Sequence, residues 1–305
     1  MTHDLIPTID PSLSLSIQDI AGQLAPSSRR VYLIDAHHFA AWMQEQGLTP
    51  DTMTRSHLIA YRRYLAETIQ ANGNPYSKSS LQRMFAIACR LMKEQAISHH
   101  TENITQEIKG FKVQGESTHA ALSKEQARDM LSSIDVTTSK GKRDYALMLL
   151  LAKTGIRRAE CVALNRCDIQ MMDGHHVAII EHGKGDKKRV VKLRVEVFRA
   201  LEVYISAIDL ATDGPLFVAF HRSDRATARR LTDKTVERLV KHYAPADVAL
   251  TPHGLRSTFA TIALDSGAAL HKVQYALGHA DPRTTERYHR RKTNLDDNAV
   301  DVLNF

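Results

Sequence analysis

The segment Thr251-Pro-His-Gly-Leu-Arg256 combines a histidine and an arginine in a way that suits anion chemistry. Thr251 is a suitable N-cap and Pro252 a suitable first helical residue, so a helix is expected to begin here. His253 and Arg256 then lie three positions apart on one face, beside the partial positive charge of the helix N-terminus. The segment predicts a site for one anion, although a capping histidine and a salt-bridged arginine would be a purely structural interpretation.

A second arginine stands in the segment Thr154-Gly-Ile-Arg157-Arg-Ala-Glu160. Gly155 turns the chain sharply after an apolar helix and so places Arg157 beside the core, where an unpaired charge is costly. The guanidinium therefore needs an anion, which is either internal or a bound ligand. Glu160, three residues later, can hold the guanidinium in orientation.

A lysine stands between two glycines in Gly183-Lys184-Gly185, at the tip of an expected hairpin. Glycine lets the backbone come close to a ligand, and the lysine can swing into a groove. Taken alone, the segment is typical of a surface turn, and it lacks the pattern of a phosphate-binding P-loop.

A histidine and a tyrosine follow near the C-terminal end. Gly278 suits a helix C-cap and Pro282 the start of a new helix, so His279 is expected in the corner between two helices. Tyr288 lies nearly two turns into the second of them. A tyrosine on a helix is usually part of the core, but this one stands in a crowd of basic residues, namely Arg283, Arg287, Arg290, Arg291 and Lys292.

Together these clusters supply two arginines, one lysine, two histidines and one tyrosine, a set that suits attack of a tyrosine hydroxyl on a phosphodiester. Two guanidiniums can neutralise the charge that develops on the nonbridging oxygens, in place of metal ions. Lys184 can protonate the 5′ oxygen that leaves, and His253 can accept or share the tyrosine proton.

The elements that must position these residues are mostly helical. Helical spacing and caps predict helices at about 29–45, 54–71, 77 onward, 104–109, 123 onward, 142–153, 195–208, 233–243, 252–265, 270–277 and from 282. Two strands, 175–181 and 188–193, are expected to form the hairpin. The predicted fold class is therefore mainly α with a small antiparallel sheet.

Composition and patterning divide the chain into five parts: an acidic leader over 1–26, a helical domain over 27–112, a linker over 113–120, a candidate catalytic domain over 121–292 that holds the four clusters above, and a tail over 293–305. Residues 27–292 carry 41 basic and 28 acidic side chains, a net charge of +13. A segment with this net positive charge attracts polyanions, the commonest of which is nucleic acid. A basic surface that contacts only solvent would give the same composition.

Other classes of protein fit poorly. With 43% apolar and 25% charged residues, the chain has the composition of a globular protein. Its longest apolar run, 145–152, is too short for a membrane span, and residues 1–21 lack the pattern of a signal peptide. Three cysteines without framework spacing indicate a reducing cytoplasm. The histidine pairs at 37/38, 99/100 and 175/176 lack further ligands at metal spacing, so no metal is predicted.

The clusters also resemble, in order, the motifs of the tyrosine recombinases, the phage integrase family that includes the Xer and Cre proteins. The matching motifs are T-G-I-R-x-x-E, G-K-G-x-K-x-R, H-x-x-R, and L-G-H followed nine residues later by tyrosine, within residues 121–292. The resemblance implies an active-site set of Arg157, Lys184, His253, Arg256 and His279, with Tyr288 as nucleophile and Glu160 in support.

The same resemblance implies a two-domain, C-shaped clamp around duplex DNA, with the helical domain over 27–112 as its core-binding part. Four protomers are expected to act on two sites made of inverted repeats and to exchange strands through a 3′-phosphotyrosyl bond and a Holliday junction. Neither ATP nor metal is required, so no cofactor is expected. The tail resembles a segment that docks onto a neighbouring protomer, and the alternative is that it packs on its own domain or frays.

Two positions depart from the family pattern, since Ser257 stands where histidine is frequent and Lys192 where proline is frequent. Neither is catalytic. Two other functions remain open, a type IB topoisomerase that relaxes DNA without pairing sites, and a catalytically idle DNA-binding protein. A catalytically idle DNA-binding protein has no need of Tyr288. The target sequence, the direction of the reaction and the accessory factors are not predicted.

Overall fold

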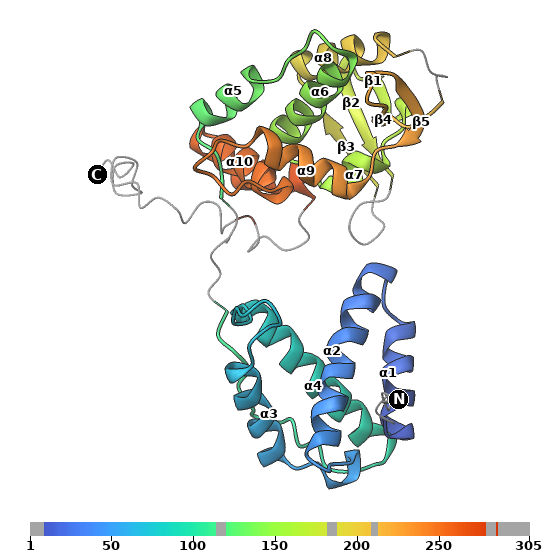
Figure 1. Cartoon of the computed structure of the whole chain (residues 1–305), viewed down its shortest axis with the longest axis vertical. Helices are drawn as coiled ribbons and strands as arrows, with labels where there is room; N and C mark the ends of the chain where they lie inside the picture. Colours follow the sequence, from blue (N-terminus) through green and yellow to red (C-terminus); the bar gives the residue numbers. More distant parts are fainter. Residues whose placement is uncertain (1–8, 114–119, 182–187, 209–212, 279–284, 286–305) are drawn as a thin grey trace, which may run out of the picture. The chain divides into compact units, whose positions relative to one another are not determined.

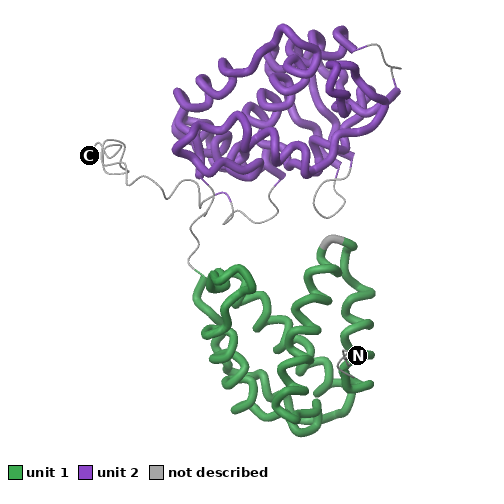
Figure 2. The backbone as a smooth tube through the Cα atoms, viewed as in Figure 1, with its two compact units in different colours: residues 1–114 green, residues 115–305 purple. Residues whose placement is uncertain are grey.

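The computed structural model describes residues 9–113, 120–181, 188–208, 213–278 and 285. The chain divides into two compact units, residues 1–114 and residues 115–305 (Figure 2). Within the described residues, no helix is both long and apolar enough to cross a membrane.

The described residues of unit 1 form helices, one short 3₁₀ turn and an isolated β-bridge between Ile69 and Pro75 (Figure 1). Its elements are α1 (Pro11–Gly22), α2 (Pro26–Glu45), η1 (Pro50–Thr52), α3 (Arg55–Glu67) and α4 (Lys78–Ser98). The apolar stripe of α4 lies in the core, as its helical spacing predicts, from Leu81 to Met92. Phe39 and Trp42 of α2 pack on Tyr61 of α3, with ring centroids 4.8 and 5.0 Å apart, and this contact joins the two helices.

The predicted separation of an acidic leader from the helical bundle at residue 27 is wrong. Residues of the leader form α1, whose Leu13, Ile17 and Ile20 are buried against α2 and α4. The side chain of Gln95 on α4 donates to the Ser12 carbonyl at 3.0 Å and to the Ser16 hydroxyl at 2.8 Å. The leader therefore completes the core of unit 1, because its apolar residues recur at helical spacing despite its acidic charge.

Three smaller expectations in unit 1 also need correction. Helix α2 begins at Pro26, with Ala25 as N-cap, rather than at about residue 29. Helix α3 ends at Glu67, four residues before the expected limit. Residues 104–107 form a turn and not a helix, because the Asn103 side chain accepts hydrogen bonds from the backbone and hydroxyl of Thr105.

Unit 2 combines helices with two small antiparallel sheets. Its helices are α5 (Lys124–Ser132), α6 (Ser139–Thr154), α7 (Arg158–Ala163), η2 (Arg166–Asp168), α8 (Val195–Ser206), α9 (Asp233–Tyr243), α10 (Pro252–Asp265) and α11 (Leu270–Leu277). Strands β1 (Ile169–Met172), β2 (His175–Ile180) and β3 (Arg189–Lys192) form one sheet in that order, and β4 (Val218–Phe220) pairs with β5 (Ala226–Arg230). The mainly helical fold class with small antiparallel sheets is confirmed.

Helix α6 is the centre of unit 2 and packs against α8 and α10 (Figure 1). Its Leu147, Met148 and Leu150 have no exposed surface, which explains why residues 145–152 form an uninterrupted apolar run. The helix ends at Gly155, whose φ of 62° is left-handed, as the sequence predicts. A methyl group at Gly155 would lie 2.6 Å from the ring of Phe259, so glycine is required there for space as well as for backbone angle.

Several predicted starts and ends in unit 2 are confirmed. Ser123 and Gln126 form the capping box of α5, and α9, α10 and α11 span the expected residues. Strands β2 and β3 pair antiparallel as the expected hairpin, whereas β1, β4 and β5 were not predicted. The hairpin tip 182–187, the new helix expected from Pro282 and the tail over 293–305 lie outside the described residues.

Candidate active site

A hollow of about 390 Å³ in unit 2 brings three of the predicted residues to one place. Seven of its nine lining residues are polar or charged, and the full set is Arg157, Arg158, Ala159, Asp233, Glu237, Thr251, Pro252, His253 and Arg256. Arg157 precedes α7, whereas His253 and Arg256 belong to the first turns of α10. Side chains that are about 100 positions apart in the sequence therefore share one pocket.

Arg256 is held by the carbonyl ends of two helices. Its side chain is buried, with 2% of its surface exposed. Nη1 donates to the carbonyl of Gly155 after α6 at 2.6 Å, and Nη2 donates to the carbonyl of Leu277 at the end of α11. Because helix C-termini carry partial negative charge, both contacts stabilise the buried cation and fix the plane of its guanidinium.

The guanidinium of Arg157 is likewise held by a carbonyl at the end of a helix. Its Nη2 donates to the carbonyl of Gly278 at 3.0 Å, and Gly278 is the left-handed residue that ends α11. Its Nη1 donates to Oε1 of Glu160 at 2.7 Å, the contact that their spacing suggests. The side chain keeps 25% of its surface exposed, so the guanidinium is anchored and still accessible from the pocket.

Glu160 is a buried carboxylate with a full set of donors. Besides Nη1 of Arg157, its oxygens accept from the Arg157 backbone N–H at 2.7 Å and from both Nη atoms of Arg189 at 2.8 and 2.7 Å. Burial alone would raise the pKa of Glu160, but the hydrogen bonds from Arg189 and Arg157 outweigh it and lower the pKa to about 2. Glu160 is therefore ionised at neutral pH.

Arg189 is the residue of this site that the sequence reasoning missed. It is the final arginine of the G-K-G-x-K-x-R motif and the first residue of β3, and only 10% of its side chain is exposed. The motif itself was the available signal. Nothing in the local sequence connects Arg189 with Glu160, because 29 positions separate the two residues.

His253 occupies the first turn of α10, as predicted. Thr251 caps this helix by accepting from the backbone N–H of Gly254 at 3.0 Å, and Pro252 is its first residue. His253 is exposed and lines the pocket, while its own carbonyl accepts from the Ser257 hydroxyl at 3.1 Å. An imidazole here can exchange a proton with a ligand at the pocket.

Three predicted site residues, Lys184, His279 and Tyr288, lie outside the described residues. The structure describes residues on both sides of the segment that contains Lys184, and the residue immediately before His279. Ile180 pairs with Arg189 across the hairpin, on either side of the segment that contains Lys184. Gly278, immediately before His279, is bonded through its carbonyl to Arg157. The catalytic roles of all six residues and of Glu160 remain predictions.

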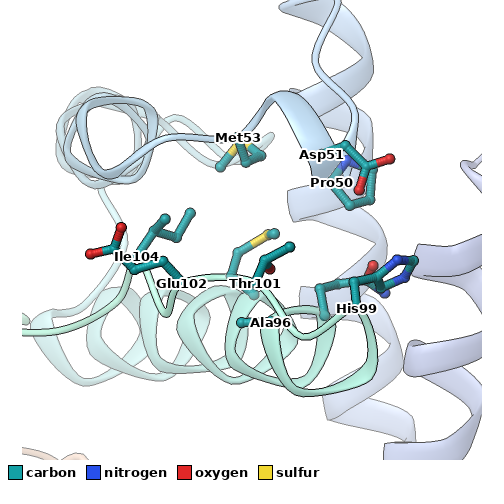
Figure 3. A pocket seen from close by; sticks show the side chains of 10 residues that line it. Pro50, Asp51, Met53, Ala96, His99, Thr101, Glu102 and Ile104 are labelled. Atoms are coloured by element: carbon teal, nitrogen blue, oxygen red, sulfur yellow. The ribbon is translucent and has the colours of Figure 1, made fainter.

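A second hollow, of about 260 Å³, lies in unit 1 between η1 and the end of α4 (Figure 3). Apolar side chains such as Met53 and Ile104 line it together with Asp51, His99 and Glu102. None of the predicted catalytic residues is among them. In the described part of the chain, no group of three or more His, Cys, Asp or Glu side chains is arranged to hold a metal ion.

The sequence is similar to a known protein family and to named recombinases. The model of the phage integrase family matches residues 120–294. The tyrosine recombinase XerD of Listeria monocytogenes is 30% identical over 286 residues, which cover 90% of this chain and 91% of the relative. Tyrosine recombinase XerC 2 of Ralstonia nicotianae is 31% identical over 266 residues, covering 85% and 75% of the two chains.

Solved structures share the fold. A lambda integrase dimer bound to a COC′ core site aligns with a TM-score of 0.67 at 16% identity, covering 94% of this chain and 97% of that chain. The XerH recombinase bound to a palindromic difH substrate aligns with a TM-score of 0.66 at 20% identity, covering 89% and 79%. The family match spans more than half of the sequence and contains the whole of the pocket described above. This chain is a tyrosine recombinase of the phage integrase family.

Proposed function

We propose that this protein is a site-specific recombinase that cuts and rejoins duplex DNA through a covalent 3′-phosphotyrosyl intermediate. The observation that supports this most directly is the pocket that Arg157, His253 and Arg256 share. Both guanidiniums are fixed before any ligand binds, by helix-end carbonyls and by Glu160. Preorganised charge of this kind stabilises a transition state in which negative charge develops on phosphate oxygens.

The proposed cleavage step uses the residues of this pocket together with Tyr288, Lys184 and His279. The guanidiniums of Arg157 and Arg256 bind the nonbridging oxygens of the scissile phosphate. The oxygen of Tyr288 forms a bond to phosphorus, and its proton passes to His253. The bond from phosphorus to the 5′ oxygen breaks, and that oxygen takes its proton from Lys184. His279 is proposed as a further donor to the phosphate.

Rejoining reverses the same chemistry. A free 5′ hydroxyl from the partner duplex attacks the 3′-phosphotyrosyl bond and releases Tyr288. One phosphoester replaces another at each step, so the cycle conserves bond energy and uses neither ATP nor a metal ion. The double-stranded DNA attracts the basic body of the chain, which has a net charge of +13 over residues 27–292.

The proposed assembly has four protomers on two recombination sites with inverted repeats, which exchange strands in pairs through a Holliday junction. The two units of the chain would act as the two halves of a clamp on DNA, with unit 1 as the core-binding part. The tail over 293–305 is proposed to dock onto a neighbouring protomer. Integration, excision, inversion and dimer resolution all use this chemistry.

Covalent trapping tests the proposal whatever the target sequence is. The full chain is incubated with a pool of duplexes that have randomised sequence and a single nick. Cleavage beside the nick releases a short fragment, and the loss of this fragment prevents rejoining, so the covalent intermediate accumulates. Protein-linked DNA is isolated after denaturation and sequenced. Proteolysis and mass spectrometry then identify the residue that carries the nucleotide.

We expect an adduct on Tyr288 with the wild-type chain and none with Tyr288→Phe, which still binds the selected duplexes. An adduct on any other residue contradicts the nucleophile assignment. DNA binding without an adduct in the wild-type chain would favour a catalytically idle binding protein. An adduct accompanied by relaxation of supercoiled plasmids, without exchange between two selected sites, would favour a topoisomerase.

A further inference from the structure

We propose that Arg189 is a positioning residue of the catalytic centre, which neutralises Glu160 and so leaves the positive charge of Arg157 for the phosphodiester. This inference rests on the proposed function and extends it to a residue outside the expected catalytic set. Arg189 is the one arginine that contacts both oxygens of Glu160 through its side chain among the described residues.

The hydrogen bonds around Glu160 define the arrangement. Oε1 accepts from Nη1 of Arg157 and Nη1 of Arg189, and Oε2 accepts from the Arg157 backbone and Nη2 of Arg189. Two donors on each oxygen fill the four acceptor positions of a carboxylate. All acceptor positions of Glu160 are therefore occupied. The carboxylate cannot accept a second hydrogen bond from the Arg157 guanidinium, which would pull that guanidinium away from the pocket.

The balance of charge gives Arg189 its function. Glu160 and Arg157 alone would form a pair with no net charge, in which the side chain of Glu160 is only 3% exposed. With Arg189, the three side chains carry one net positive charge. Arg157 is the arginine that presents this charge to a ligand, because it lines the pocket and its side chain is 25% exposed. The side chain of Arg189 is only 10% exposed. A low-dielectric setting increases the effect of this charge on a bound anion.

Arg189 also touches two other parts of the site. It begins β3, directly after the hairpin segment that contains Lys184. Its side chain packs on Gly278, where a methyl group would lie 3.1 Å from Cδ and Nε of Arg189. A defect caused by losing Arg189 can therefore pass through Arg157 or through the hairpin, and the experiment must separate these two routes.

Chemically modified substrates separate them. A nicked duplex selected by the wild-type chain is prepared with three scissile linkages: the natural phosphodiester, a methylphosphonate and a 5′-bridging phosphorothiolate. The methylphosphonate lacks the negative charge that Arg157 neutralises, so cleavage depends less on that arginine. The phosphorothiolate has a sulfur leaving group, which needs no proton and bypasses Lys184.

The variants are Arg189→Gln, Arg189→Lys, Glu160→Gln and the double variant Glu160→Gln with Arg189→Gln. Arg194→Gln serves as the matched control, because Arg194 makes an ion pair of 2.7 Å with Glu196 but is 72% exposed. Single-turnover cleavage is measured at saturating protein. Circular dichroism and thermal melting of each variant show whether it is folded, and Arg189→Lys retains the charge if the glutamine variant does not fold.

We expect Arg189→Gln to slow cleavage of the phosphodiester by about 10-fold to 100-fold, and Arg194→Gln to leave it unchanged. On the methylphosphonate, Arg189→Gln should come within about threefold of the wild-type chain, as charge neutralisation is no longer needed. The phosphorothiolate should not rescue it. Adding Glu160→Gln restores the net charge of the cluster and should recover about tenfold of the lost rate.

Rescue by the phosphorothiolate alone would overturn the proposal, because the defect would then lie in the delivery of the leaving-group proton. Equal defects on all three linkages, with additive effects in the double variant, would show a merely structural role and also overturn it. Both results require that the wild-type chain forms an adduct. Absence of that adduct would refute the proposed function itself, so the two failures are distinguishable.

Discussion

Nη1 of Arg256 lies 2.6 Å from the carbonyl oxygen of Gly155, 101 positions earlier in the chain. This contact links the first turns of α10 to the end of α6, the central helix of unit 2. It also means that the pocket that Arg256 lines is held together by backbone carbonyls as well as by side chains. Changes to either partner should therefore affect both stability and cleavage.

Arg256→Lys should abolish most of the cleavage activity. A lysine keeps the positive charge, but its single ammonium cannot reach the Gly155 and Leu277 carbonyls and also bind a phosphate in the fork geometry of a guanidinium. We expect single-turnover cleavage of the nicked duplex to fall by about 10² to 10³. Cleavage at the wild-type rate would show that the two backbone contacts do not position a catalytic group.

Gly155→Ala should destabilise the chain more than the same change at an open glycine with a similar backbone angle. At Gly155 the φ is 62° and a methyl group would lie 2.6 Å from Phe259 and 2.8 Å from Leu277. At Gly174 the φ is 73° and nothing lies within 4 Å.

Urea unfolding should therefore show losses of about 3 kcal/mol for Gly155→Ala and about 1 kcal/mol for Gly174→Ala. Because the altered residue also carries the carbonyl that binds Arg256, Gly155→Ala should slow cleavage, whereas Gly174→Ala should not. Equal losses of stability at both sites would contradict the steric argument.

Lowering the pH should reduce the free energy of unfolding, because Glu160 becomes protonated. The folded-state pKa of about 2 lies below the ordinary value of 4.5, so the ionised carboxylate stabilises the folded state above pH 4.5. This stabilisation is lost progressively as the pH falls from 4.5 toward 2, and it amounts to about 3 kcal/mol in total. The measurement is urea unfolding at several pH values in that interval.

Glu160→Gln provides the reference, because the glutamine does not titrate. The difference in unfolding free energy between the wild-type chain and Glu160→Gln should shrink as the pH falls below 4.5. A difference that stays constant down to pH 2.5 would mean that Glu160 is not held ionised by Arg157 and Arg189.

Ile17→Ala should destabilise unit 1, whereas Leu15→Ala on the same helix should not. Ile17 is 3% exposed in the core between α1, α2 and α4, and Leu15 is 61% exposed. A buried isoleucine replaced by alanine loses about 2 to 5 kcal/mol, while a surface change stays within about 0.5 kcal/mol. Thermal melting of both variants checks the assignment of residues 11–22 to the bundle, and equal melting temperatures would contradict it.

The sequence predicts local features of this fold well. Caps and stops are set by the types of one or two residues, so Thr251, Ser123 and Gly155 identify helix ends correctly. The boundary at residue 27 follows the change from an acidic to a basic segment, and this criterion overlooks the apolar stripe of α1, namely Leu13, Ile17 and Ile20. Strands β1, β4 and β5 are short, and their pairing depends on partners that local patterns do not reveal.

In the candidate site, too, some contacts follow from local spacing in the sequence and others do not. Spacing alone suggests that Glu160 reaches Arg157, because three positions on a helix bring side chains together. The contacts from Arg256 to Leu277 and from Arg189 to Glu160 join separate elements. Such contacts arise from tertiary packing, and no periodicity in the sequence encodes them.

Helix α7 also carries Cys161, directly after Glu160, and this thiol has no exposed surface. Burial raises its pKa above the ordinary range, so the thiol is inert to alkylating reagents while the helix is in place. Cys167 is exposed and reacts without any opening. The chain thus contains a natural pair of reporter and reference thiols, and the rate at which Cys161 becomes labelled measures how often the helix beside Arg157 opens in solution.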